Sequence, residues 1–181
     1  MKKTDIRVIY KDPSALSEKQ ITVGGWVRSV RDLKTFGFMD LNDGTSFKGL
    51  QVVLNTTDLK NYAEVSKLNA GSSVICKGKL VVTPNAKQPF ELHATDVEVV
   101  GATDSAYPLQ KKGHSLEFLR EQAYLRPRTN LFNAVYRVRS EASFALHKFF
   151  NEQGFVYLQA PILTSSDCEG AGELFRVSTQ G

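Results

Sequence analysis

The chain has 181 residues, of which 41% are hydrophobic and 23% charged, and its formal net charge is +4. This composition is ordinary for a globular protein, and no apolar run is long enough to predict a membrane span. The first residues, "MKKTDIRVIYKDP", lack the apolar core of a signal peptide, and Cys76 and Cys168 are far apart. We therefore expect a cytoplasmic protein with reduced thiols. The mild positive charge permits a nucleic-acid partner without requiring one.

Residues 20–100 predict a β-rich domain. The strand patterns "ITVGGWV", "GFMDL" and "LQVVL" come first, and "SVICKGKLVV" and "FELHATDVEVV" follow. The "NDG" at 42–44 is a strong turn signal, and residues 59–71 predict a short helix that ends at Gly71. Three strands, one helix and two strands suit the five-stranded oligonucleotide-binding (OB) barrel. We expect this domain over residues 1–102.

A polar segment with Pro108 and Gly113 follows, and we interpret residues 103–128 as a linker or hinge. Within it, Ser115 is placed to cap a short helix through "LEFLREQAYL". A long helix is predicted from about residue 131 to residue 153, because apolar residues recur there at steps of three and four.

Gly154 is placed to end the long helix. The next segment, "FVYLQAPIL" at 155–163, is predicted to be a strand whose pairing Pro161 limits. One helix, one strand and an acidic loop cannot bury both of their faces. A strand at this position needs a sheet to join. We therefore expect residues 129–181 to be an incomplete domain whose partner elements come from a longer protein or another chain.

The stretch "GWVRSVRDLKTFGFMDLNDG" places Arg28, Arg31 and Lys34 close to Phe36 and Phe38. Cations interleaved with aromatic rings suit single-stranded nucleic acid, since the cations meet phosphates and the rings stack on bases. Phenylalanines in a strand are also common core residues, and a lone lysine is usually solvated. Alternation places both phenylalanines on one face, but the pattern leaves open whether that face is inside or outside.

For Trp26 we expect a place in the core, as for most large apolar side chains. Gln51 and Glu91 offer directed polar atoms that suit base edges, although exposed glutamines and glutamates are common. Cys168 is interpreted as a small buried or loop residue, because no basic neighbourhood marks it as reactive. The three histidines show no metal-ligand spacing with the cysteines, so we expect no metal site.

Several segments together resemble a known family. "VGGWVRSVRD…FMDLNDG…LQVV" is similar to the anticodon-binding domain of the class II synthetases for aspartate, asparagine and lysine. "LRPRTN" at 125–130 resembles the opening of their catalytic domain, and "RVRSEASFALHKFFNEQGFVYLQAPIL" resembles their motif 1. "SSDCEGAGELFRV" is similar to the amino-acid-binding loop of the asparagine-specific members. The aspartate-specific members carry "PEGARD" in place of "CEGAGE".

This resemblance implies roles for residues of the barrel. Phe38 matches the aromatic residue that stacks on the central anticodon base, with Phe36 as its rival. Arg31 matches an arginine that contacts the anticodon. Gln51 matches a glutamine that reads a base edge, and Glu91 matches an acidic residue that reads the neighbouring base.

The resemblance also implies an amino-acid site near the end of the chain. Glu169 matches the carboxylate that holds the α-ammonium group of the substrate. Asp167 and Glu173 belong to the same loop. Gly170 and Gly172 would let that loop close over the substrate, because glycine reaches backbone angles that other residues avoid.

The same resemblance implies a homodimer through motif 1, with Arg137, Phe150 and Pro161 at the interface. The full-length enzyme would use ATP and Mg²⁺ to activate asparagine and would then charge the matching tRNA. Motifs 2 and 3, which carry the ATP-binding arginines, are not in these 181 residues. We therefore expect this chain to hold neither ATP nor Mg²⁺ and to be inactive alone.

Three interpretations follow from the sequence. The first is the N-terminal portion of an asparagine-specific class II synthetase, with the tRNA for asparagine and a second copy of the chain as partners. The second is an aspartate-specific synthetase, against which "DCEGAGE" argues. The third is a tRNA anticodon-binding module without catalysis, which does not conflict with the first if the natural protein is longer. DNA and membranes are not expected partners.

Overall fold

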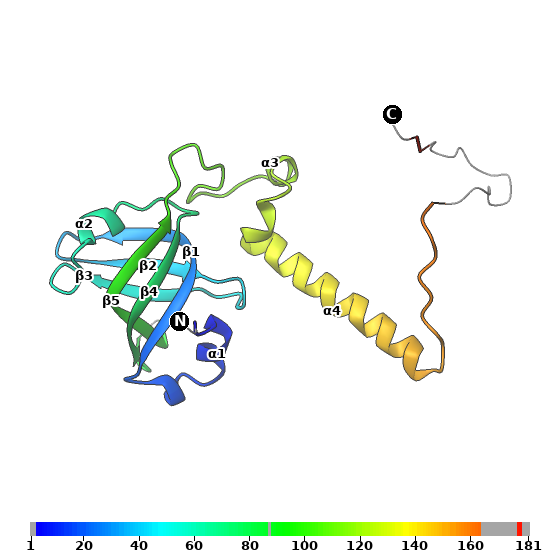
Figure 1. Cartoon of the computed structure of the whole chain (residues 1–181), viewed down its shortest axis with the longest axis horizontal. Helices are drawn as coiled ribbons and strands as arrows, with labels where there is room; N and C mark the ends of the chain where they lie inside the picture. Colours follow the sequence, from blue (N-terminus) through cyan, green and yellow to red (C-terminus); the bar gives the residue numbers. More distant parts are fainter. Residues whose placement is uncertain (1–2, 87, 164–176, 179–181) are drawn as a thin grey trace. The chain divides into compact units, whose positions relative to one another are not determined.

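The computed structural model describes residues 3–86, 88–163 and 177–178. Its main feature is a closed barrel of five strands (Figure 1). The neighbouring strands follow the order β1-β2-β3-β5-β4, and β4 closes the barrel against β1. The strands are β1 Gln20–Asp32, β2 Phe36–Asn42, β3 Leu50–Asn55, β4 Ser73–Val82 and β5 Phe90–Gly101. The β3–β5 pair is parallel and the other pairs are antiparallel. The predicted OB barrel is confirmed.

Alternation along the strands explains where the core lies. Every second residue of β2 is buried, and the same pattern continues in β3, β4 and β5. Successive side chains of a strand point to opposite faces, so one set fills the interior and the other faces outward. The fully buried interior side chains include Met39, Leu41, Val52, Leu54, Leu80 and Leu92.

A short helix, α1 Ile6–Lys11, contributes to the same core, and it was not expected from the sequence. Ile6 and Ile9 are fully buried in the barrel cluster. The Asp43 carboxylate accepts a hydrogen bond from the backbone N–H of Ile6 at 2.7 Å and so satisfies one of the free donors at the start of the helix. A 3₁₀ turn, η1 Ser14–Leu16, leads from α1 toward β1.

The helix predicted over residues 59–71 is shorter than expected. Helix α2 covers only Tyr62–Val65, and turns occupy most of the rest. The segment is held by side chains rather than by helix length. Asn61 donates from Nδ2 to the Val97 carbonyl at 2.8 Å, and the Tyr62 hydroxyl donates to Asp32 at 2.7 Å. Burial and this bond to Asp32 raise the pKa of Tyr62 to about 12.

The second part of the chain contains α3 Leu116–Glu121, a 3₁₀ turn, η2 Arg126–Arg128, and the long helix α4 Asn130–Glu152. The predicted cap of α3 is confirmed, since the Ser115 hydroxyl accepts a hydrogen bond from the Phe118 N–H at 3.2 Å. The predicted end of α4 is also confirmed. Gly154 has a φ of 86°, a left-handed conformation that commonly ends helices.

The chain divides into two compact units, Met1–Arg137 and Val138–Gly181. The segment predicted as a linker therefore belongs with the barrel in the first unit, where Leu109, Leu119 and Leu125 form a small buried cluster. In the second unit, residues 155–163 form no strand, so the strand prediction there is wrong. A strand needs a neighbour for its backbone hydrogen bonds, and the described part of the second unit offers none.

No helix among the described residues is long and apolar enough to cross a membrane. Cys76 is fully buried in β4. Burial, with a smaller contribution from Asp96, raises the pKa of this thiol to about 12. Cys76 therefore stays protonated and is a structural core residue.

Candidate nucleic-acid interface

The outer face of the barrel brings together the side chains that the sequence singled out. In the cross-strand register, Arg31 of β1 lies opposite Phe38 of β2, and Phe38 lies opposite Val53 of β3. Val53 in turn lies beside His93 of β5. Residues opposite one another in neighbouring strands share a face of the sheet. We call Arg31, Phe38, Val53 and His93 the aromatic row.

A polar row runs beside the aromatic row, one pleat away. Ser29 pairs with Asp40, and Asp40 pairs with Gln51. The Gln51 amide continues the row, because its Nε2 donates to the Glu91 carboxylate at 2.6 Å. We call Ser29, Asp40, Gln51 and Glu91 the polar row. The tertiary structure thus joins Gln51 and Glu91, which are 40 residues apart in sequence.

The alternative left open for the two phenylalanines is decided by the structure. Phe36 is exposed and Phe38 is half-buried, and neither belongs to the barrel core. Their rings meet edge to face with centroids 5.5 Å apart. The two rings therefore support each other, and both lie outside the barrel core. This arrangement provides a platform on which a base can stack.

The cations near the platform differ in their surroundings. Arg31 is exposed, and within the described residues its guanidinium makes no hydrogen bond or ion pair. Lys34 occupies the turn between β1 and β2 with a φ of 76°, and its backbone N–H donates to Asp32. Arg31 therefore lies directly across from Phe38 with its charge available to an anion.

His93 also lies on this face, although the sequence pattern did not mark it as a binding candidate. Its Nε2 lies 3.7 Å from the second carboxylate oxygen of Glu91. The His93 side chain is 42% exposed and that of Glu91 is 18% exposed. Glu91 thus lies between Gln51, which it hydrogen-bonds, and His93. The signal was present in "FELHATD", since residues two apart in a strand share a face.

Asp40 gives the polar row a carboxyl group whose pKa is raised. Its side chain is half-buried, and burial raises the pKa of this carboxyl, while the charge of Arg28 opposes that shift. Burial disfavours the charged form of an acid.

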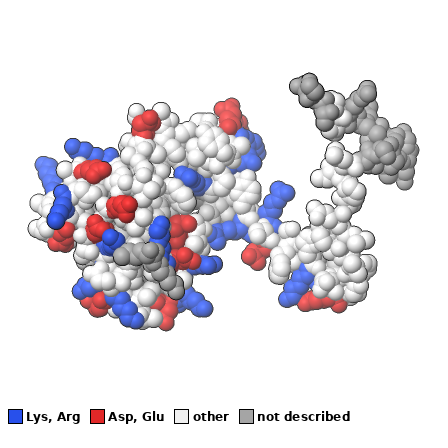
Figure 2. Space-filling model, in the orientation of Figure 1, with Lys and Arg blue, Asp and Glu red and all other residues white. Residues whose placement is uncertain are grey.

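Positive and negative side chains are interspersed over the face of the barrel visible in Figure 2.

The expected burial of Trp26 is wrong. Its side chain is 41% exposed. In β1 the inward positions are those of Val23 and Val27, so strand alternation turns Trp26 outward. The Arg128 guanidinium covers the indole, 4.7 Å from the ring centroid. A cation–π contact of this kind stabilises by about 0.5–1 kcal/mol at an exposed site.

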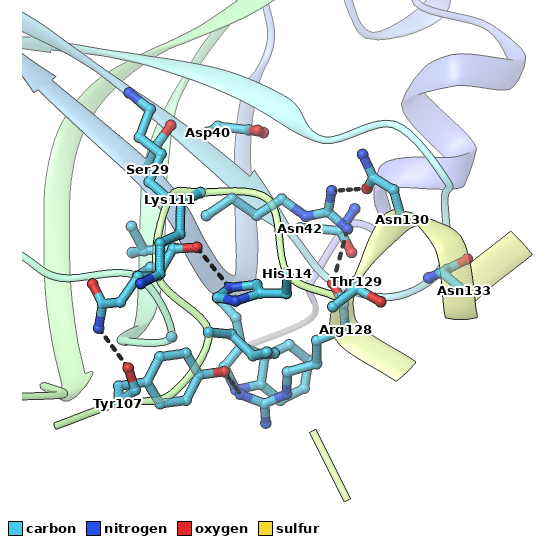
Figure 3. Close-up of a pocket in the computed structure, with 18 of the residues that line it drawn as sticks. Ser29, Asp40, Asn42, Tyr107, Lys111, His114, Arg128, Thr129, Asn130 and Asn133 are labelled. Atoms are coloured by element: carbon cyan, nitrogen blue, oxygen red, sulfur yellow. Dashed lines mark hydrogen bonds between the residues drawn. The ribbon is translucent and has the colours of Figure 1, made fainter. Parts of the chain in front are cut away.

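A cavity of about 730 Å³ lies beside Trp26 in the first unit (Figure 3). Arg28 crosses it to donate to the Asn130 amide oxygen, and Arg128 donates to the Tyr107 hydroxyl at 3.4 Å. The Arg28 bond attaches the end of residues 107–130 to the barrel, and the Arg128–Tyr107 bond joins two residues within that segment. The ionic side chains that line the cavity are Asp40, Arg28, Lys111, Lys112 and Arg128. Their excess of positive charge suits an anionic ligand rather than a cation.

The remaining predicted site residues lie elsewhere. Asp167, Glu169, Gly170, Gly172 and Glu173 are outside the described residues. Arg137, Phe150 and Pro161 are exposed. Among the described residues, no group of three or more histidine, cysteine, aspartate or glutamate side chains could hold a metal ion.

Two family models match the chain. The model described as OB-fold nucleic acid binding domain covers residues 21–100, and the model described as tRNA synthetases class II (D, K and N) covers residues 115–181. The chain therefore belongs to the class II tRNA synthetases of the aspartate, lysine and asparagine group. Within that group it corresponds to the N-terminal portion of the asparagine-specific members, as its relatives show.

The asparagine–tRNA ligase of Acetivibrio thermocellus is 55% identical over 99% of this chain and 39% of that protein. The asparagine–tRNA ligase of Bacillus cereus (strain ATCC 10987 / NRS 248) is 52% identical over the same shares. The chain thus spans about two fifths of the length of these curated relatives.

Solved structures show the same fold. Asparaginyl-tRNA synthetase from Pyrococcus horikoshii, complexed with asparaginyl-adenylate, matches 99% of this chain and 41% of its own, with a TM-score of 0.85 at 23% identity. Aspartyl tRNA synthetase from Entamoeba histolytica matches 91% of this chain and 40% of its own, with a TM-score of 0.74 at 20% identity. The asparagine- and aspartate-specific structures share this architecture, so the architecture does not distinguish the two amino acids.

Proposed function

We propose that this chain is the anticodon-binding portion of an asparagine–tRNA ligase that works in the cytoplasm. The observation that carries the proposal is the pairing of an aromatic platform with the Gln51–Glu91 hydrogen bond on one outer face of the barrel. High identity to asparagine–tRNA ligases supports it. The partner of this face would be the anticodon loop of the tRNA for asparagine, with the anticodon GUU.

Each residue then has a distinct part in binding. Phe38 stacks on the central base, supported at its edge by Phe36, and such a stack is worth ~1–3 kcal/mol per base. Arg31 meets a backbone phosphate beside that base. Gln51 and Glu91 read base edges, since an amide and a carboxylate together offer a donor and acceptors of fixed direction.

The chemistry of the longer protein is part of the same proposal. Asparagine would be activated with ATP and Mg²⁺ and then transferred to the tRNA. Glu169 would hold the α-ammonium through a charge-assisted hydrogen bond of ~1.5–3 kcal/mol, and Asp167, Gly170, Gly172 and Glu173 would complete the loop. We propose that residues 1–181 alone do not form the adenylate, because the ATP-binding arginines of motifs 2 and 3 are not among them.

Binding to an RNA hairpin tests the anticodon role. We expect residues 1–181 to bind a hairpin that carries GUU more tightly than the same hairpin with its central base changed to C. A fluorescence anisotropy titration at constant salt measures both affinities. Because phosphate contacts release counterions, the logarithm of the affinity should also fall linearly with the logarithm of salt concentration. Equal affinity for the two hairpins would overturn base-specific recognition.

The exposed face of α4 supports a second part of the proposal, a homodimer. Most of its exposed apolar residues, though not Phe144, are spaced along one side of the helix, and the described residues leave them uncovered. This row consists of Leu131, Val135, Val138, Leu146 and Phe149. Large exposed apolar surfaces mark interaction sites. We propose that a second copy of the chain covers this row, with Arg137, Phe150 and Pro161 at the interface.

Sedimentation velocity tests the dimer. We expect wild-type residues 1–181 to form dimers at high protein concentration and the variant Leu146→Asp to remain monomeric, because a charge cannot be buried without a partner. Asn85→Asp is the matched control, since Asn85 is exposed in the turn between β4 and β5, outside α4, and its replacement should leave the dimer intact. A monomeric wild type, or equal dimerisation of both variants, contradicts this interface.

A further inference from the structure

His93 is a titratable group on the proposed RNA-binding face, and neither the sequence nor the family likeness assigned it a role. It lies beside Val53 in β3 and opposite Lys79 in β4. Glu91 lies two residues earlier on the same strand, and 3.7 Å separates the His93 imidazole from its carboxylate. With 42% of its side chain exposed, the ring is accessible to a ligand on this face.

Charged side chains lie near His93 on its own strand, on β4 and in the segment after β3. From its own strand it faces Glu91. From the segment after β3 it acts on Asp58, whose pKa is lowered by hydrogen bonds from Asn55 and Thr57 and, to a smaller extent, by the charge of His93. From β4 it faces Lys79, whose ammonium is already paired with Glu18 at 2.6 Å. From β3 it lies beside the neutral Val53.

An RNA on this face would meet the negative charge of Glu91. Gln51 binds one oxygen of that carboxylate but brings no positive charge. A protonated imidazole beside the other oxygen offsets the repulsion between the carboxylate and the phosphates. It also fixes the carboxylate in place, since His93 and Gln51 hold it from two directions.

We propose that His93 is a positioning residue for Glu91 and that RNA binding takes up a proton at His93. This inference rests on the proposed anticodon function and adds a pH dependence to it. Binding raises the affinity of the imidazole for its proton, so the added binding strength is present in full below the pKa of the free protein. It is lost as pH rises through the higher pKa of the complex.

The test is the affinity for the GUU hairpin between pH 5.8 and pH 8.0 at constant salt. Ordinary histidines titrate near pH 6.5, inside this range. We expect wild-type binding to tighten about threefold toward the acidic end, the size of an exposed charge pair. In His93→Gln this tightening should be absent, because glutamine keeps a hydrogen-bond donor but has no proton that titrates in this range.

The chain offers matched controls, since its other histidines are His114 and His147. His114→Gln and His147→Gln should keep the wild-type pH dependence. Asp40→Asn should also keep the wild-type pH dependence. That result would exclude Asp40, whose pKa is raised by burial, as the source of the pH dependence. A pH dependence that persists in His93→Gln overturns the proposal, and so does a flat wild-type profile with base-specific binding intact. Loss of base-specific binding at every pH would instead refute the proposed function.

Discussion

Replacement of Phe38 by alanine is expected to weaken binding of the GUU hairpin at least about tenfold. Loss of one base stack costs ~1–3 kcal/mol, and about 1.4 kcal/mol corresponds to a factor of ten in affinity. Phe38 lies between Arg31 and Val53 in the register of the outer face. A change there removes the platform and leaves the buried core of the barrel unaltered. Fluorescence anisotropy at constant salt measures the effect.

Two further variants make this result specific. Phe36→Ala removes the edge support and should cost less than Phe38→Ala. Tyr124→Ala removes an aromatic ring that is 77% exposed and lies outside the barrel strands, so its binding should equal that of the wild type. If Phe38→Ala binds normally and Phe36→Ala does not, Phe36 is the platform. If both bind normally, the base does not stack on this pair.

Replacement of Gly78 by alanine is expected to destabilise the barrel by about 3 kcal/mol, as severe overpacking does. A Cβ at this position would lie 2.1 Å from the His93 carbonyl oxygen and 2.8 Å from its carbonyl carbon. Both atoms belong to the backbone, so relief requires β4 and β5 to move apart. The register between these strands already shifts at Lys77 and Gly78. Urea unfolding followed by circular dichroism measures the change.

Gly113→Ala is the matched control for Gly78→Ala. No atom lies within 4 Å of a Cβ at Gly113 in the described structure, and the segment is not part of the barrel. We expect its unfolding midpoint to match that of the wild type, or to rise slightly because alanine restricts the unfolded chain. Equal midpoints for Gly78→Ala and the wild type would show that β4 and β5 approach less closely than the structure indicates.

Local sequence signals predicted the elements that depend on nearby residues. The barrel strands alternate clearly because one face of each is buried. The Ser115 cap and the end of α4 at Gly154 follow from backbone groups within one helical turn. The length of the helix at 59–71 was overestimated, because the sequence pattern indicates a short helix without fixing its length. Its turns are fixed instead by the distant contacts of Asn61 and Tyr62.

Residues whose surroundings come from distant segments were harder to predict. Trp26 was expected in the core, yet it packs under Arg128, about 100 residues later in the chain. Helix α1 was missed because six residues carry little periodic signal, and its burial depends on the barrel end near Asp43. The strand predicted at 155–163 has suitable residues, but strand formation depends on a neighbouring strand.

The sequence by itself determined the element order, the barrel class and the pool of candidate residues, because alternation, caps and turn residues act over a few positions. It also placed Phe36 and Phe38 on one face. Only the tertiary structure decided that this face is outside, and only it joined Gln51 to Glu91. The physical reason is that strand pairing sets these contacts, and the register of β3 against β5 is fixed by packing of the whole barrel rather than by local sequence.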